Sequence, residues 1–280
     1  MTPPKIHALT IDDLDDCLAI AVDRDWRPEA HKWRLLFELG TVYGTRDEHD
    51  SLVGTTAVTR FEGVAAIGMV LVAKSHAGRG LGRALMEHAI AADADAVFIL
   101  NATEFGQPLY SKLGFVTVGM THTHVGVFGA AVESAATDTV TRVVGVGEVP
   151  SLVELDAAVV GARRASLIER LFGYADEIRV VERDGETTGF AARWSNIDNT
   201  QIGPIVAESE DDAKALINDL AAGAGGPVRL DLDGRHPRLR AWASEHGVAP
   251  LHSSTLMVKN AASFPGDRSR WFSPLMQAVG

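Results

Sequence analysis

Residues 70–86 read Val70-Leu71-Val72-Ala73-Lys74-Ser75-His76-Ala77-Gly78-Arg79-Gly80-Leu81-Gly82-Arg83-Ala84-Leu85-Met86. An apolar segment typical of a buried strand leads into a loop with glycine at every second position, and the loop passes directly into a run of good helix formers. Glycine lets backbone N–H groups turn inward, and the first turn of a helix adds N–H groups that have no intrahelical acceptor. This combination predicts a binding site for a phosphate or pyrophosphate group.

The loop lies in a window without carboxylates. From Gly63 to Met86 there is no Asp or Glu, whereas Lys74, Arg79 and Arg83 are present. Because the 280-residue chain has a formal net charge of −11, such a window favours an anion-binding loop over a turn that only packs a helix against a sheet. The glycines at positions 78, 80 and 82 do not match the dinucleotide fingerprint, and no Walker lysine follows them.

Composition limits the classes of partner. The acidic balance argues against nucleic acid or an anionic membrane surface. The longest apolar run, residues 64–73, is too short to span a bilayer, and no signal-peptide pattern follows Met1. The single cysteine, Cys17, excludes an internal disulfide framework and fits a reducing compartment. We therefore expect a cytoplasmic protein with no metal site, for which a homodimer is left open.

Strand and helix patterns alternate along the chain and predict an α/β (α+β) fold whose element order occurs twice. Residues 202–207 match residues 67–72 at an offset of 135, and residues 215–217 match residues 84–86 at an offset of 131. The second loop is therefore four residues shorter than the first. A strand over residues 115–127 is expected to close the first half. We interpret the second half as a degenerate internal duplication.

This interpretation divides the chain into four parts. They are a domain over residues 1–128, a small and polar linker over 129–137, a second domain over 138–262 and a tail over 263–280. The tail contains Trp271, Phe272 and Leu275, so it is expected to pack back onto one of the two domains.

Residues 72–83, then Asn101, then residues 109–115 resemble the GCN5-related N-acetyltransferase (GNAT) superfamily. The glycine loop resembles the acyl-CoA pyrophosphate motif of that family, and the Tyr-x-x-x-Gly-Phe run that begins at Tyr110 resembles its next characteristic block. The resemblance covers roughly residues 5–127, and the whole chain resembles a bacterial subset in which a second, divergent copy follows the first. It implies two tandem GNAT-like domains, each a mixed, mostly antiparallel sheet flanked by helices. Ala77 departs from the pattern, since the family usually has Arg or Gln there.

The resemblance implies acetyl-CoA as the acyl donor. Backbone groups of Val70 and Val72 would pair with the pantetheine arm, and N–H groups from Gly78 to Arg83 would hold the pyrophosphate. Arg79 or Lys74 could reach the outer phosphates. The residues expected to contact the cofactor are Val70, Leu71, Val72, Ala77, Gly78, Arg79, Gly80, Leu81, Gly82, Arg83, Asn101, Thr103, Gln107 and Tyr110.

The implied reaction is transfer of an acetyl group to a primary amine of a small molecule by direct attack. A strand N–H near Leu71 or Val72 can stabilise the oxyanion, and Tyr110 is the natural proton donor to the leaving sulfur. The strand over residues 67–72 has no carboxylate, so the base is sought elsewhere, with His124 and Glu104 as candidates. A weakly basic acceptor or a water relay would need no dedicated base. The alternative function is an acyl-CoA-binding sensor or scaffold without turnover.

The second copy lacks these features. Its loop reads Glu208-Ser209-Glu210-Asp211-Asp212, and carboxylates at a helix start satisfy the helix dipole and repel a pyrophosphate. Aligning Gly247 with Gly114 places Ala243 where Tyr110 stands. The second copy is therefore expected to bind no coenzyme A and to complete the acceptor pocket or cover the open edge of the first domain.

Four residues are candidates for the acceptor site. Arg163 and Arg164 form a basic spot that could hold an acidic group of the acceptor, although an exposed helix start is the ordinary interpretation of such a pair. Trp26 and Trp33 could form a wall of the site, with core packing as an equal alternative.

Overall fold

The computed structural model describes residues 4–129 and 139–280, so the predicted linker lies almost wholly outside the described residues. The strands are β1 (Ile6–Ala8), β2 (Gly40–Arg46), β3 (Leu52–Phe61), β4 (Val64–Val72), β5 (Val97–Ala102), β6 (Val116–Gly126), β7 (Thr141–Val143), β8 (Glu177–Arg183), β9 (Glu186–Ser195), β10 (Thr200–Val206), β11 (Val228–Asp233), β12 (Ala249–Lys259) and β13 (Trp271–Ser273). The α-helices are α1 (Leu14–Asp23), α2 (Ala30–Leu39), α3 (Leu81–Ala91), α4 (Gln107–Lys112), α5 (Val149–Val160), α6 (Ala165–Tyr174), α7 (Glu210–Ala222) and α8 (Pro237–Glu245). Short 3-10 turns η1 (Ile11–Asp13), η2 (Lys74–His76) and η3 (Val146–Glu148) precede α1, α3 and α5.

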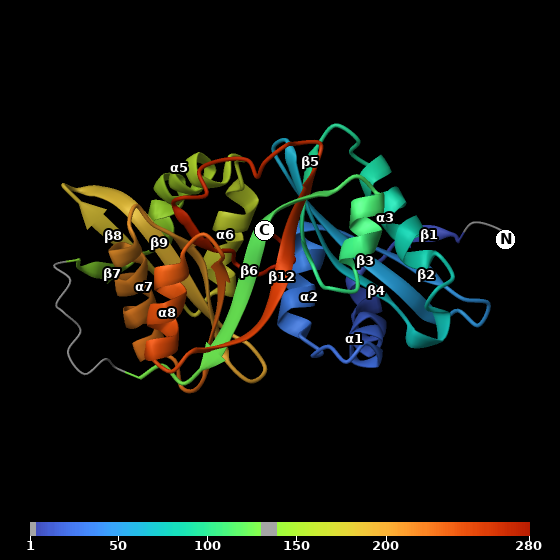
Figure 1. Cartoon of the computed structure of the whole chain (residues 1–280), viewed down its shortest axis with the longest axis horizontal. Coiled ribbons are helices and arrows are strands. Elements are labelled where there is room, and N and C mark those ends of the chain that lie inside the picture. The colour runs from blue at the N-terminus through green and yellow to red at the C-terminus, as the bar shows by residue number, and fades with distance from the viewer. Residues whose placement is uncertain (1–3, 130–138) are drawn as a thin grey trace.

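One mixed sheet runs through the whole molecule (Figure 1). Its strand order is β1-β2-β3-β4-β5-β12-β6-β11-β10-β9-β8-β7, with β13 paired to β10. Strands β1 to β5 form one end and β7 to β11 form the other. The expected α/β fold with two copies of the same element order is confirmed.

The two halves exchange their last long strands at the centre of the sheet. Strand β12, from the C-terminal half, pairs with β5, while β6, from the N-terminal half, pairs with β11. Strands β6 and β12 also pair with each other. The strand expected over residues 115–127 is present as β6, but it pairs with β11 and β12 rather than with a strand of its own half. A strand's alternating pattern fixes which face is buried but does not fix which neighbour it pairs with.

In each half, a pair of parallel strands diverges. Strands β4 and β5 pair only where residues 64–66 lie beside residues 97–99, although β4 continues to Val72. Strands β10 and β11 pair only where residues 200–202 lie beside residues 228–230. Each divergence begins next to an irregularity: Met69 has a φ of +51° in β4, and the register of β10 shifts between Ile202 and Ile205. The two halves therefore present the same V-shaped opening between strands.

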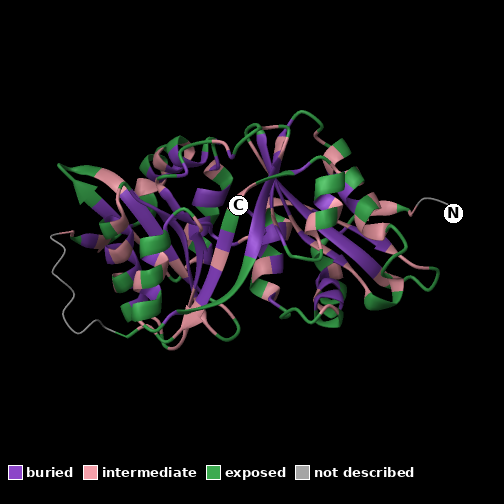
Figure 2. Cartoon of the chain, viewed as in Figure 1, coloured by how far each residue is buried: buried purple, intermediate pink, exposed green. Residues whose placement is uncertain are grey.

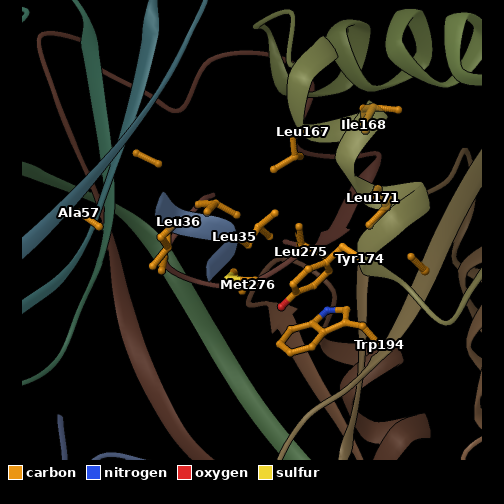
Figure 3. Close-up of a cluster of buried hydrophobic side chains, with 14 of the residues drawn as sticks. Leu35, Leu36, Ala57, Leu167, Ile168, Leu171, Tyr174, Trp194, Leu275 and Met276 are labelled. Atoms are coloured by element: carbon orange, nitrogen blue, oxygen red, sulfur yellow. The ribbon is translucent and has the colours of Figure 1, made fainter. Parts of the chain in front are cut away.

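Helices cover both faces of the sheet. On one face α1, α2, α5 and α6 share a single hydrophobic core that spans both halves, part of which is drawn in Figure 3. On the other face α3 and α4 cover one core and α7 and α8 cover another. Strands β4, β10 and β11 are mostly buried, whereas β6 and β12 are buried over only part of their length, as Figure 2 shows. Within the described residues, no helix is both long and apolar enough to cross a membrane.

The C-terminal segment, residues 264–280, packs against both halves. Strand β13 pairs antiparallel with β10, and the chain then continues to the opening between β4 and β5. A Cβ placed on Gly68 would lie 2.8 Å from the Cα of Ala278, and one on Gly280 would lie 2.5 Å from the Cδ1 of Ile99. The segment therefore closes the apex of the first V on the face that carries α1 and α2.

Candidate functional site

The glycine loop after β4 has an open, left-handed backbone. Gly78 and Gly80 have φ values of +76° and +81°, a region that other residues rarely adopt. A Cβ at either position would meet no described atom within 4 Å, so the space in front of both glycines is open. Gly80 is the N-cap of α3 and offers no side chain to cap it. The loop thus leaves a cradle that any side chain at these positions would partly fill.

Six successive backbone N–H groups are available at this cradle. The N–H groups of residues 78–80 donate to no backbone or side-chain acceptor in the part of the chain that the structure describes. Those of residues 81–83 belong to the first turn of α3, whose ladder begins with the N–H of Ala84 bonded to the carbonyl of Gly80 at 3.0 Å. Orphan N–H groups at the positive end of a helix dipole form a site suited to an anion.

The three basic side chains of the loop have different surroundings. Lys74 pairs with Asp25 at 2.7 Å, and its backbone N–H donates to Asp23 at 2.6 Å, so the lysine is attached to the end of α1. Arg83 pairs with Glu87 at 3.2 Å along α3. Arg79 is exposed and forms no ion pair with any described residue. Arg79 is therefore the cation that is freest to reach a bound anion.

Tyr110 lies on α4, next in the chain to Leu109, and its ring lies against Gly106. A Cβ on Gly82 would lie 3.7 Å from Val72 and 3.5 Å from Leu109, so the end of β4, the start of α3 and the helix α4 are in contact. The Tyr110 side chain is 8% exposed, and its hydroxyl bonds to none of the described residues. Burial raises the pKa of Tyr110 to about 12, so the phenol keeps its proton at neutral pH and can donate it.

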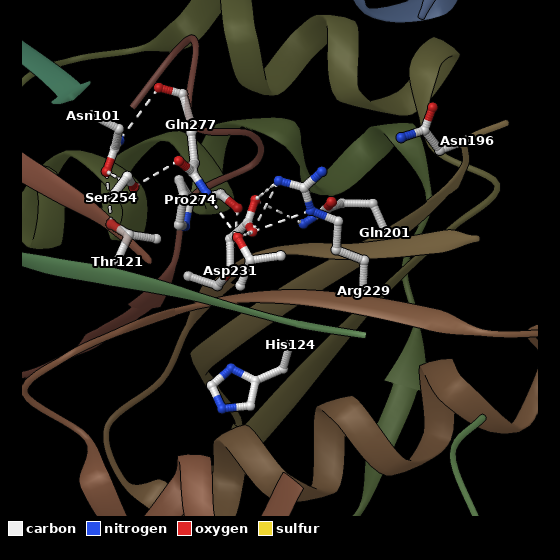
Figure 4. Close-up of polar contacts among 12 residues, drawn as sticks. Asn101, Thr121, His124, Asn196, Gln201, Arg229, Asp231, Ser254, Pro274 and Gln277 are labelled. Carbon is white, nitrogen blue, oxygen red and sulfur yellow. Dashed lines mark hydrogen bonds and ion pairs between the residues drawn. The ribbon is translucent and has the colours of Figure 1, made fainter. Parts of the chain in front are cut away.

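Asn101 stands on β5 beyond the last residue paired with β4. Its amide group faces the C-terminal segment and donates to the carbonyl of Gln277 at 3.3 Å. Its side-chain oxygen accepts from Thr121 at 2.7 Å and from Ser254 at 3.3 Å (Figure 4). Asn101 therefore joins strands from both halves to the segment at the apex of the V, a role that the sequence pattern did not indicate.

The structure does not bring His124 together with the loop. His124 is 3% exposed on β6, between Leu230 of β11 and Pro250 of β12, and lies across the sheet from the Asn101 network (Figure 4). Burial lowers its pKa, and its Nδ1 lies 3.1 Å from the carbonyl oxygen of His122. Glu104 is exposed in the turn between β5 and α4, close in the chain to Asn101.

The other expected cofactor contacts lie around the same opening. Ala77 is exposed just before the cradle, and Thr103 and Gln107 lie in the turn that begins α4. The carbonyl of Thr103 accepts from the N–H groups of both Gly106 and Gln107 at 3.0 Å. The turn after β5 and the loop after β4 thus border the two arms of the V.

Three of the four expected acceptor residues are engaged elsewhere. Trp33 is fully buried in the core, whereas Trp26 is 40% exposed in the loop between α1 and α2. Arg163 pairs with Glu154 at the surface. Arg164 is 1% exposed, forms a bidentate pair with Asp156 and donates to the carbonyl of Gly280 at 2.7 Å. Arg164 is thus a buried structural side chain, since its donors are already used.

The start of α7 in the second half is closed. Ser209 is the N-cap of α7, and its hydroxyl accepts from the N–H of Asp212 at 3.1 Å. The first helical turn carries Glu210, Asp211 and Asp212, and Asp212 is fully buried beside Arg183. A helix start that is capped by its own side chains has fewer N–H groups to offer an anion.

The second V is also filled. Strand β13 pairs with the end of β10, with Ser273 opposite Ile205 and Trp271 opposite Val206. These residues of β10 correspond, at the offset of 135, to Val70 and Leu71 of β4. The protein's own chain therefore occupies the edge of β10 that is the counterpart of the open edge of β4.

Other reactive groups offer no second centre. Burial raises the pKa of the Cys17 thiol to about 12, so the cysteine is held as an unreactive thiol. Within residues 4–129 and 139–280, no three His, Cys, Asp or Glu side chains are grouped so that they could hold a metal ion.

Two family models match the chain, and both are described as an acetyltransferase (GNAT) domain. One matches residues 38–117 and the other matches residues 152–273. A curated protein of Bacillus subtilis, the uncharacterized N-acetyltransferase YitH, is 28% identical over 216 residues, which is 76% of each chain.

Solved structures show the same arrangement over 91–100% of the chain. A proposed acetyltransferase of Pyrococcus horikoshii matches with a TM-score of 0.80 at 18% identity, over 100% of this chain and 97% of its own. A GCN5-related N-acetyltransferase of Sphaerobacter thermophilus matches with a TM-score of 0.66 at 14% identity, over 95% and 98%. A tandem GNAT protein from the clavulanic acid biosynthesis pathway matches with a TM-score of 0.60 at 14% identity, over 91% and 97%. These likenesses establish a shared fold.

Proposed function

Because the chain belongs to the GNAT family of N-acetyltransferases and contains two GNAT domains in tandem, we propose that its N-terminal half transfers an acetyl group from acetyl-CoA to a primary amine of a small molecule. The observation that carries this proposal is the cradle at Gly78 and Gly80, next to an edge of β4 that pairs with no strand of the described residues beyond residue 66.

The residues present fit a pyrophosphate-bearing acyl carrier. The N–H groups of residues 78–83 are unpaired within the described residues, and the space in front of Gly78 and Gly80 is open. Arg79 can neutralise an outer phosphate, while Lys74 is held by Asp25 at the rim. The open edge of β4 at Val70 and Val72 offers backbone groups to an amide-rich arm. The bound thioester supplies an activated acyl group.

The residues of the chain then have two tasks in acyl transfer. A backbone N–H at Leu71 or Val72 donates to the acyl carbonyl oxygen, where negative charge develops during attack. Tyr110 gives its phenolic proton to the departing sulfur: its raised pKa keeps the proton on the phenol at neutral pH, and no acceptor among the described residues is bonded to it. No covalent bond to the protein is required.

The acceptor amine must lose a proton during the reaction. Of the two candidate bases, we retain Glu104 in this role, because it lies in the exposed turn after β5, beside the opening. His124 lies across the sheet and under α8, so a role for it would require transfer through the sheet.

We further propose that the second half binds no acyl-CoA and is degenerate as an enzyme. The Ser209 cap, the carboxylates of the first turn of α7 and the pairing of β13 with β10 support this view. Its part is to complete the acceptor side of the single active site, to which it contributes β12 and residues 274–280.

The test is release of coenzyme A from acetyl-CoA in the presence of a panel of primary amines. The proposal predicts amine-dependent release by the full chain that disappears in the Gly80→Glu variant. Tight binding of acetyl-CoA without release across a broad panel would instead support the sensor alternative.

A further inference from the structure

We propose that Arg229 of β11 binds a carboxylate of the acceptor, at a position about 1 nm from the amine that is acetylated. This inference rests on the proposed function and adds the class of substrate: an elongated primary amine with a carboxylate at its far end. The sequence analysis expected Arg163 and Arg164 to bind such a carboxylate, but both are paired with other residues. We assign this role instead to Arg229, which the sequence pattern did not indicate.

Arg229 lies in a row of side chains across three strands of the second half. In the sheet register, Trp194 of β9 lies opposite Gln201 of β10, and Gln201 lies opposite Arg229 of β11. Side chains of directly paired residues share a face of the sheet. This row and the Asn101 network lie on the same face, as Figure 4 shows for Gln201, Arg229 and Asn101.

Asp231 holds the guanidinium of Arg229 by one edge. Arg229 Nε and Nη2 each donate to Asp231 Oδ1 at 3.1 Å, and Nη2 also lies 3.0 Å from Oδ2. The Asp231 side chain is 1% exposed, and its carboxylate also accepts a hydrogen bond from the Thr123 hydroxyl at 2.6 Å. The charge of Arg229 holds the pKa of Asp231 below its usual range. A guanidinium fixed by its Nε–Nη2 edge is preorganised to present its other edge to a second carboxylate.

The second edge of Arg229 is available. Its Nη1 forms no hydrogen bond with any residue in the described part of the chain, and the side chain is 20% exposed. Glu29 lies close enough for the charge of Arg229 to help lower the pKa of this carboxyl, but Glu29 is already bonded to Lys32 and to Asn196. Both neighbouring carboxylates therefore have partners, and Arg229 keeps a cationic donor for a ligand.

Buried polar atoms beside this row also lack partners. The Tyr174 ring lies 5.1 Å from the Trp194 ring and stacks on His31 at 4.0 Å. Tyr174 is 8% exposed and Trp194 is 1% exposed, yet neither the Tyr174 hydroxyl nor Trp194 Nε1 has a hydrogen-bond partner among the described residues. In Figure 3 the Tyr174 hydroxyl points away from α6, toward Met276. Such orphaned groups are expected to be satisfied by a ligand or water.

A continuous set of hydrogen bonds links Arg229 to the opening between β4 and β5. From Asp231 it passes through Thr123 to the Gln277 side chain at 3.1 Å, and the Gln277 carbonyl accepts from Asn101. Between β5 and β11 lie β12 and β6, so three strand spacings, about 14 Å, separate these two strands across the sheet. Arg229 lies opposite Val125 of β6, whereas Thr121, which bonds to Asn101, lies four residues away on β6, about 13 Å along the strand. Because the Arg229 guanidinium is held toward Asp231 and the Asn101 amide is held toward Thr121, we take the separation of amine and carboxylate as roughly 10–14 Å.

Glycine oligomers measure that span directly. An extended peptide covers about 3.3–3.6 Å per residue, so the carboxylate of N-acetyl-triglycine or N-acetyl-tetraglycine would reach Arg229 from the acetylated nitrogen. The probes are N-acetylglycine to N-acetyl-pentaglycine, each as the free acid and as the C-terminal amide. Their affinities are measured by calorimetry with the full chain in the presence of coenzyme A. Binding of these product-like probes requires no turnover.

We expect the acid to bind about 10- to 100-fold more tightly than its amide at three or four residues, and about equally at one residue. The double variant Arg229→Gln/Asp231→Asn removes both charges, leaves no buried unpaired carboxylate, and should abolish the preference. Arg163→Gln, at the exposed arginine paired with Glu154, should keep it.

Equal affinity of acid and amide at every length, absence of binding, or a preference that survives in the double variant would overturn the assignment of Arg229. A clear acid preference without amine-dependent release of coenzyme A would support the Arg229 site and contradict the proposed acetyl transfer. The two proposals can therefore fail separately.

Discussion

The loops that follow β4 and β10 start from equivalent strands and end in helix starts of opposite character. Both strands are irregular at the same aligned position, where Met69 has a φ of +51° and Pro204 lies within the register shift. After β4 the chain makes two left-handed turns at Gly78 and Gly80 and enters α3 without a side-chain cap. After β10 only residues 207–209 intervene, in place of residues 73–80 after β4, and the chain enters α7 through the Ser209 cap.

Under the proposed function, this difference lets one fold carry an anion site in one copy and exclude it from the other. The sheet and the diverging strands persist in both halves, so the fold does not by itself create the site. The site depends on whether the helix start keeps its N–H groups free or bonds them to its own side chains. In the second half, carboxylates occupy the first turn of α7 and strand β13 occupies the edge of β10, whereas the corresponding positions of the first half are open.

The largest effect is expected from making the first loop resemble the second. Gly80→Glu places a side chain at a φ of +81° and a carboxylate at the helix start, so acetyl-CoA affinity should fall by more than about 100-fold. Calorimetry measures the loss. The matched control is Gly225→Glu, at an open glycine of the second half without a positive φ, which should bind normally. Retained affinity in the Gly80 variant would show that the cradle does not hold the cofactor.

The next largest effect is expected at Tyr110, whose aligned position in the second half holds Ala243. Tyr110→Phe should lower kcat about 100-fold and leave the KM for acetyl-CoA nearly unchanged, because only the proton donor is lost. Since burial raises the pKa of Tyr110 to about 12, its ionisation should cause no alkaline loss of kcat below about pH 11. Tyr43→Phe, at a tyrosine packed against His88, is the control. An unchanged kcat would remove Tyr110 from the mechanism.

A smaller effect is expected at the exposed rim of the first loop. Arg79→Gln should weaken acetyl-CoA binding about 3- to 10-fold at low salt, and the difference should shrink as salt screens the exposed charge. The affinity ratio of wild type to variant at two ionic strengths is the measurement. A ratio that does not change with salt would indicate that Arg79 acts through packing.

No change in acetyl-CoA affinity is expected when the N-cap of α7 in the second half is removed. Ser209→Ala removes the bond to the N–H of Asp212 and should lower the free energy of unfolding by about 1 kcal/mol. Urea titration reports the stability, and calorimetry reports the acetyl-CoA affinity, which should stay at the wild-type value. A gain of a second binding event would show that the cap is all that closes this half.

The sequence was most informative where local chemistry decides the structure. Alternating glycines and the helix formers behind them predicted the cradle at α3. The acidic start of α7 likewise follows from residues that are neighbours in the chain. In these places, a side chain or a residue with a positive φ determines the conformation of the segment to which it belongs.

Long-range pairing was not predictable from the sequence. Strands β6 and β12 have the same length of 11 residues, and nothing local dictates that each pairs with the other half. The exchange moved His124 to a site between β11 and β12. The burial of Arg164 was not predictable for a similar reason, since its partners Asp156 and Gly280 come together only in the folded chain.

The central claim is that each chain has one acyl-CoA site, made by the loop after β4. Calorimetric titration of the full chain with acetyl-CoA tests it most directly. We predict a stoichiometry of one molecule per chain, which Gly80→Glu abolishes. A stoichiometry of two, or binding at one site that survives in Gly80→Glu, would contradict the account.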